Sequence, residues 1–99
     1  MNNQFTLAAT DASIQVIGDL TRKTIIGKQQ KVFADIVNGQ HQAVDLSQLK
    51  NVDTAGLAWL LMLFQYAKQK QSTINYSQAP VELVKLAKLS RVDQLLNID

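Results

Sequence analysis

Residues 42–70 read QAVDLSQLKNVDTAGLAWLLMLFQYAKQK, and this stretch organises the rest of the chain. Its first residues, 42–46, predict a short apolar strand, and the polar run 47–51 predicts a turn. An apolar helix is then expected over about 54–70, ending in lysines that suit the negative end of its dipole. A strand that passes through a turn into a helix is the unit from which α/β folds are built.

Two apolar stripes run along the predicted helix. The first has the i, i+3, i+4, i+7 spacing of a core face and comprises Leu57, Leu60, Leu61, Phe64 and Ala67. The second is rotated away from it and comprises Ala55, Trp59, Met62 and Tyr66, with Leu63 at its margin. A helix that is apolar all round is buried on two sides or covered by a partner. Because an exposed Trp-Met-Tyr patch marks an interaction site, we expect the second stripe to bind a partner, unless the terminal segment 92–98 folds over it.

Asp53 and Thr54 stand at the entrance of this helix. Either side chain can accept hydrogen bonds from the free N–H groups of the first turn, which stabilises a helix by about 1 kcal/mol. The partly positive N-terminal end of a helix also favours a phosphate or an acidic partner beside Thr54. The residues alone leave the structural and the functional role open.

Further strands are expected on both sides of this stretch. Alternating apolar residues on either side of the turn-like 10–12 predict a hairpin, whose second strand ends at 18–19. Ile74 and Tyr76 alternate with polar neighbours and predict another strand over 73–76. Strand–helix–strand units pair in parallel by right-handed crossovers, so with the hairpin the sheet is expected to be mixed.

Two further helices are expected. The first covers 23–38, where Thr21 or Thr24 caps its start and Gly39 stops it in the left-handed conformation. The second begins with Pro80 as its first helical residue and runs to about Leu89. The sequence leaves open whether 92–98 forms a helical turn or a strand.

Composition and charge exclude several classes of function. The chain has 99 residues, of which 46% are hydrophobic and 18% charged, and this predicts one compact domain over 1–99. It has no cysteine, so disulfides and cysteine-based metal sites are excluded. Ten basic residues against eight acidic ones are scattered along the sequence, and no nucleic-acid partner is expected.

Neither catalysis nor a bound cofactor or metal is expected. His41 is the only histidine, so a Ser/His/Asp arrangement and the usual zinc set find no support in the sequence, and no glycine-rich phosphate-binding motif is present. The protein is therefore predicted not to be an enzyme. The N-terminus does not read as a signal peptide, and the longest apolar run, 55–64, is far shorter than the ~20 residues of a membrane span. We expect a cytoplasmic protein that does not itself cross the membrane.

The entrance to the apolar helix resembles the signature of STAS domains, the anti-sigma-factor antagonists and their relatives. The resemblance lies in Val44-Asp45-Leu46-Ser47 and in Val52-Asp53-Thr54-Ala55-Gly56-Leu57. It implies a STAS-like α/β fold, with a mixed sheet of about four to five strands and about three to four helices packed mainly on one face. In the bacterial antagonists the pattern is Asp-Ser-Ser-Gly-Leu, and a partner kinase phosphorylates the first serine. Thr54 stands at that position, and Ala55 replaces the second serine.

Within the family, the chain is similar to the small, MlaB-like STAS subunit of the Mla phospholipid ABC transporter of Gram-negative bacteria. There the motif reads Asp-Thr-Gly-Gly-Leu-Ala, and here it reads Asp53-Thr54-Ala55-Gly56-Leu57-Ala58. The later Lys68-Gln69-Lys70 and Leu86-Ala87-Lys88-Leu89 also resemble that subunit's helix ends. The likeness implies an accessory subunit that binds the MlaF-like ATPase subunit, and through it the permease, at the inner face of the cytoplasmic membrane. The expected partner-binding residues are Asp53, Thr54, Ala55, Trp59, Met62 and Tyr66.

Two alternatives stay open at this point. The family likeness also implies an anti-sigma-factor antagonist that is switched off by phosphorylation at Thr54. A small ligand in a pocket at the head of the helix is less favoured, because Lys50 is the only base close to Thr54 in the sequence.

Overall fold

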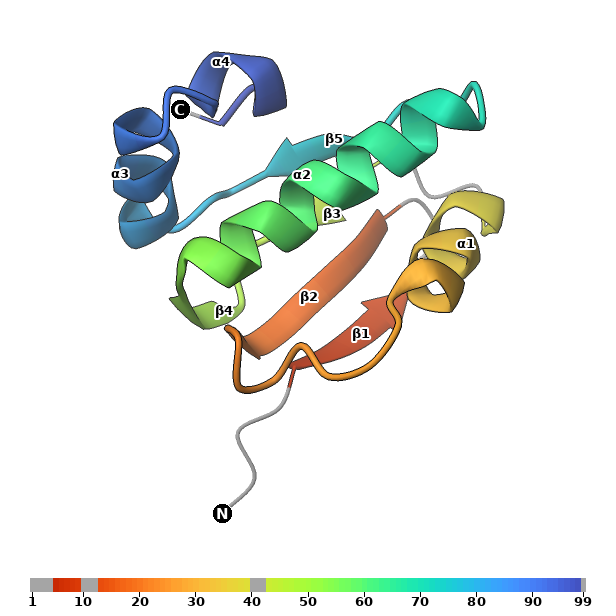
Figure 1. Cartoon of the computed structure of the whole chain (residues 1–99), viewed down its shortest axis with the longest axis horizontal. Helices are drawn as coiled ribbons and strands as arrows, with labels where there is room; N and C mark the ends of the chain where they lie inside the picture. The colour runs from red at the N-terminus through yellow and green to blue at the C-terminus, as the bar shows by residue number, and fades with distance from the viewer. Residues whose placement is uncertain (1–4, 10–12, 40–42, 99) are drawn as a thin grey trace.

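A mixed five-stranded β-sheet forms the base of the molecule, and helices lie across it (Figure 1). The structure is a computed structural model that describes residues 5–9, 13–39 and 43–98. Along the chain the elements are β1 (Phe5–Ala9), β2 (Ser13–Leu20), α1 (Gln30–Asn38), β3 (Ala43–Asp45), β4 (Leu49–Val52), α2 (Thr54–Gln69), β5 (Asn75–Ser77), α3 (Val81–Leu89) and α4 (Asp93–Leu96). The predicted α/β class and mixed sheet are confirmed.

The strands follow the order β1-β2-β3-β5, and β4 pairs with the far end of β2. β1 and β2 are antiparallel, as in the predicted hairpin, whereas β3, β4 and β5 run parallel to their neighbours. The turn predicted over 10–12 lies outside the described residues. β2 is thus the central strand, since it pairs with three others.

One face of the sheet is buried and the other is polar. Ile14, Val44 and Tyr76 lie in register on three neighbouring strands, and all three are buried. One residue further along, Gln15, Asp45 and Ser77 are in register on the opposite face, where Gln15 Nε2 donates to Asp45 Oδ2 at 3.1 Å. This alternation explains why the helices pack on one face only.

α2 lies over the buried face, between α1 and α3 (Figure 1), and contacts both of these helices. Leu60 and Leu63 of α2 are fully buried. The Tyr76 hydroxyl of β5 donates to the Leu60 carbonyl oxygen at 2.6 Å. Leu63 was predicted at the margin of a stripe, but it lies within the buried face. The two predicted stripes therefore adjoin across one buried face, and Met62 of the second stripe is exposed at its edge.

β4 was not predicted, because its residues were read as part of a polar turn. Lys50 and Asn51 are exposed, and the strand forms through parallel pairing of Leu49 with Gly18 and of Val52 with Leu20. β2 accordingly continues to Leu20 instead of ending at 18–19. Backbone pairing does not require apolar side chains, so the sequence of β4 lacks the alternating pattern that would predict a strand.

α1 begins at Gln30, seven residues later than predicted, and neither Thr21 nor Thr24 caps it. Thr24 Oγ1 instead donates to the Asp19 carbonyl oxygen at 2.7 Å and accepts from the Thr21 N–H at 3.0 Å, which stabilises a separate turn. The left-handed conformation predicted for Gly39 is also wrong, since its φ is −73°.

The C-terminal part agrees with prediction more closely. Pro80 precedes α3 as its N-cap and is not its first helical residue, a shift of one position. The segment for which a helical turn and a strand were both open forms the short helix α4. Leu96 and Ile98 are buried there, with Asn97 left-handed between them at a φ of 57°.

Candidate functional site

The head of α2 is fixed by the side chain of Asp53. Its Oδ1 accepts from the Gly56 N–H at 2.9 Å, which caps the helix as predicted. Its Oδ2 accepts from the Arg22 N–H at 3.1 Å, which ties the β2–α1 loop to the same point. One carboxylate therefore holds two segments that are far apart in the sequence.

The hydrogen bonds at Asp53 keep its carboxylate charged. Partial desolvation works to raise the pKa, but hydrogen bonds from the N–H groups of Gly56, Arg22 and Ala55 outweigh it and hold the pKa below its ordinary value. The Asp53 carboxylate is thus occupied by hydrogen bonds within the protein, and the neighbouring Thr54 side chain is exposed to solvent at this end of the helix.

Gly56 allows the first turn of α2 to lie directly on the end of β2. A Cβ atom at this position would be 2.0 Å from the Leu20 carbonyl oxygen and 2.7 Å from Val52 Cγ2. No side chain fits there without moving the backbone, so the head of α2 has little freedom to shift.

Thr54 begins an exposed face that continues along α2. Ala58 and Met62 follow it at intervals of four residues, and all three side chains are exposed. Met62 is 54% exposed, which is unusual for a large apolar side chain. Thr54 and Met62, two of the residues predicted to bind a partner, thus share a surface that is open to solvent.

Trp59 is not part of that open face. Its side chain is only 2% exposed, so the sequence-based expectation of an exposed Trp59 is wrong. The ring packs edge-on against Phe5 of β1 and Phe33 of α1, with centroid distances of 5.5 and 5.2 Å. Its Nε1 donates to Gln29 Oε1 at 3.0 Å.

The segment that covers Trp59 is therefore α1 and the loop before it, together with β1. The tail 92–98 was the candidate cover in the sequence analysis, yet the ring contacts of Trp59 are with Phe5 and Phe33. Tyr66 lies about two helical turns after Trp59. It is half-buried, and its ring faces that of Phe33 at a centroid distance of 6.1 Å.

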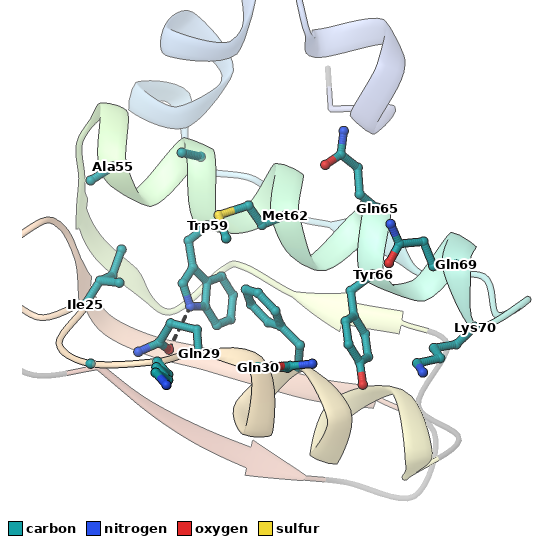
Figure 2. Close-up of a pocket in the computed structure, with 14 residues that line it drawn as sticks. Ile25, Gln29, Gln30, Ala55, Trp59, Met62, Gln65, Tyr66, Gln69 and Lys70 are labelled. Atoms are coloured by element: carbon teal, nitrogen blue, oxygen red, sulfur yellow. Dashed lines mark hydrogen bonds between the residues drawn. The ribbon is translucent and has the colours of Figure 1, made fainter.

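An open groove of about 720 Å³ runs between α1 and α2 (Figure 2). Four of the six residues predicted to bind a partner line it, namely Ala55, Trp59, Met62 and Tyr66. Asp53 and Thr54 are not among its lining residues, and they lie at the head of the same helix. Figure 2 shows Trp59 and Tyr66 pointing from α2 toward α1 and the loop before it.

The opposite wall of the groove was missed by sequence reasoning. It is formed by residues of the β2–α1 loop and the start of α1, namely Ile25, Gly27, Lys28, Gln29, Gln30 and Phe33. All six were assigned to a longer helix predicted over 23–38, whereas α1 begins at Gln30 and the residues before it form a loop. The signal available in the sequence was Gly27, whose φ of +77° is unfavourable inside a helix.

Metal and membrane features are limited in the part of the chain that is described. Residues 5–9, 13–39 and 43–98 hold no group of three or more His, Cys, Asp or Glu side chains placed to bind a metal ion. Over the same residues, no helix has the length and apolar character that a membrane span requires. His41 lies outside the described residues.

Comparison with known protein families gives one match. The family model described as "Mlab, STAS domain" matches residues 4–97, which include the head of α2 and both walls of the groove. A search of curated protein sequences returns no match. The order of strands and helices, the Asp-capped head of α2 and this match over almost the whole chain agree, and the protein belongs to the STAS domain family, in its Mlab group.

Proposed function

We propose that this protein is a non-catalytic accessory subunit of a phospholipid-transporting ABC complex. It binds the cytoplasmic ATPase subunit and supports assembly and activity of the transporter. Its place is then the cytoplasm, at the inner face of the membrane, where the ATPase holds it beside the permease. The proposal rests on the Mlab STAS family match and on the form of the exposed face of α2.

The observation that carries this proposal is the exposed Thr54 on a rigid head. Asp53 and Gly56 fix the first turn of α2 against β2, so Thr54 holds one orientation relative to the sheet. A surface that is fixed before binding loses little conformational entropy when a partner docks. Thr54 thus suits a contact whose size and charge decide whether the ATPase fits.

Apolar side chains next to this head extend the contact surface. Met62 lies two turns further along the exposed face, and Ile26, in the loop opposite, is 77% exposed. Large exposed apolar side chains are typical of protein interfaces. Trp59 then serves as a buried support beneath this surface, and Ala55 and Tyr66 form its edges.

The test is capture of the ABC-transporter ATPase subunit from the same organism. The Thr54→Arg and Thr54→Glu variants should each lower capture at least about tenfold, because a bulky charge at a docked surface must be desolvated. Thr73→Arg is the matched control, since Thr73 is also exposed but lies beyond the opposite end of α2. It should bind as the unchanged protein does.

Equal capture of all the variants, with thermal unfolding unchanged, would show that Thr54 is not in the contact. Failure of the unchanged protein to capture the ATPase would rule out the proposed function itself. The ATPase activity of the complex, measured with and without this subunit, gives a second readout of its supporting role.

A second candidate, an anti-sigma-factor antagonist, is favoured by the surroundings of Thr54. Arg22 and Lys23 line a small hollow of about 260 Å³ together with Asp19 and Asp53, the latter next to Thr54 in the sequence, and such bases stabilise a phosphate that reaches them. The helix N-terminus at Thr54 adds the partial positive charge of its N–H groups. Incubation with an anti-sigma kinase and ATP should then add one phosphate to the unchanged protein and none to Thr54→Val.

A further inference from the structure

We propose that the groove between α1 and α2 binds the anion of a long-chain fatty acid. The inference does not depend on the ATPase, because it rests on the lining of the groove alone. Its volume of about 720 Å³ lies within the ~300–1,000 Å³ range of small-molecule sites.

The groove has an apolar floor. Phe33 and Trp59 are buried beneath it, while Ile25 and Met62 stand on its two walls with part of their surface open. The only polar atom of the Trp59 side chain is already bonded to Gln29. The floor therefore offers apolar contact without an unsatisfied donor, which suits an alkyl chain.

The charge of the lining is one-sided. Lys28 and Lys70 line the groove on opposite walls, and none of its fourteen lining residues is acidic although the chain has eight Asp and Glu. The remaining polar lining residues include four glutamines, Gln29, Gln30, Gln65 and Gln69. A cationic head group finds no counter-charge among these lining residues, whereas an anionic one at Lys70 finds an ammonium group and amide donors, and Lys28 adds a second positive charge on the opposite wall.

The end of the groove near the C-terminus of α2 carries a cluster of polar side chains, although Gln29 also lies near Ile25 at the other end in Figure 2. Ile25 and Ala55 lie at one end in Figure 2, and Tyr66, Gln69 and Lys70 gather at the other. The Lys70 ammonium is 5.6 Å from the centroid of the Tyr66 ring, which places the charge at that end. An anionic amphiphile fits this arrangement with its carboxylate at Lys70 and its chain along Trp59 toward Ala55.

The head of α2 lies outside the proposed fatty-acid site. Asp53 and Thr54 lie outside the groove lining, so a bound fatty acid leaves Thr54 exposed. Ala55, Met62 and Tyr66 belong both to the groove lining and to the surface proposed for the ATPase, so dodecanoate binding is measured on the protein alone and ATPase capture is measured without fatty acid.

The experiment uses the intrinsic fluorescence of Trp59, which is the only tryptophan in the chain. Titration with dodecanoate below its micellar concentration should change the Trp59 emission in a saturable way. Octanoate should bind more weakly because it buries fewer methylene groups. Dodecyltrimethylammonium, which has the same chain length and the opposite charge, should bind at least about tenfold more weakly than dodecanoate.

Substitutions of lysine test where the carboxylate of the fatty acid binds. Lys70→Glu should weaken dodecanoate binding about tenfold, and Lys85→Glu, at an exposed lysine on α3, should leave it unchanged. Amide chemical shifts in residues 25–33 and 55–70 should move on binding. The proposal is overturned if dodecanoate gives no saturable change, if the cation binds equally well, or if Lys70→Glu binds as the unchanged protein does. Melting temperatures confirm that both variants remain folded.

Discussion

At the head of α2, side chains and backbone are held by directional hydrogen bonds and a close approach to β2. Along the flank that faces α1, by contrast, the aromatic rings meet edge-on or tilted and leave an open groove between the helices. Asp53 makes two backbone hydrogen bonds at the head, and Gly56 leaves no room for a single added carbon. The head is thus held rigidly against β2, whereas the flank leaves open space between the two helices.

Gly56→Ala should have the largest effect, because it breaks the close approach on which the rigid head depends. The added Cβ would overlap the Leu20 carbonyl oxygen, and the backbone of α2 or β2 must move. We expect a loss of at least about 3 kcal/mol in the free energy of unfolding, the upper range for overpacking. Urea denaturation measures it, with Ala58→Ser on the exposed face of α2 as the control. A loss below about 1 kcal/mol for Gly56→Ala would mean that the head can shift.

Asp53→Ala should come next, since it removes the cap of α2 and the tie to Arg22 together. The expected cost is about 2 kcal/mol. Asp53→Asn should cost less, because its side-chain oxygen can still accept from the Gly56 N–H while the Arg22 contact is lost. Equal costs for the two variants would show that the cap adds nothing beyond the loop tie.

The same carboxylate gives a pH dependence. The pKa of folded Asp53 lies below its unfolded value of 3.8, so its contribution is present above that pH and is lost as the pH falls through the folded pKa. The unchanged protein should therefore lose stability below about pH 4, and Asp53→Asn should lose less over the same range. Urea denaturation midpoints of both proteins, measured from about pH 2 to about pH 7, give this pH dependence of stability. Parallel curves for the two proteins would contradict it.

Gln29→Leu should have an intermediate effect on the flank. It leaves the Trp59 N–H without its acceptor, and an unsatisfied buried donor costs about 1–2 kcal/mol. The emission of Trp59 should shift at the same time. Gln30→Leu is the matched control, because Gln30 is exposed on the same wall. If both variants are equally stable, the Trp59–Gln29 bond does not hold the loop.

Met62→Ser should have the smallest effect on folding and a clear effect on binding. Since Met62 is 54% exposed, we expect its replacement to change the free energy of unfolding by at most about 0.5 kcal/mol. Capture of the ATPase should weaken nevertheless, because apolar contact area is lost. Leu89→Ser, at an exposed leucine on α3, is the control for capture and should not weaken it.

Much of the fold could be predicted from local patterns. The apolar run that became α2, the alternating residues of the hairpin and the Asp53 cap all carry their signal within a few residues. The family resemblance was read from the same short stretch, and the family match over residues 4–97 agrees with it.

What could not be predicted depends on neighbours distant in sequence. β4 exists because β2 offers it hydrogen bonds, and its own polar residues give no strand pattern. Trp59 is buried because the rings of Phe5 and Phe33 pack against it, and these residues precede it by 54 and 26 positions in the sequence. Residue spacing on α2 alone cannot show that α1 and α3 flank it on both sides.

Thiol labelling shows directly whether Thr54 and Met62 lie in the proposed contact with the ATPase. The chain has no cysteine, so Thr54→Cys, Met62→Cys and Thr73→Cys each introduce one labelling site. Maleimide labelling rates would be compared with and without the ATPase. We expect slower labelling at positions 54 and 62 in the complex and no change at position 73. Unchanged labelling at position 54 in a verified complex would contradict it.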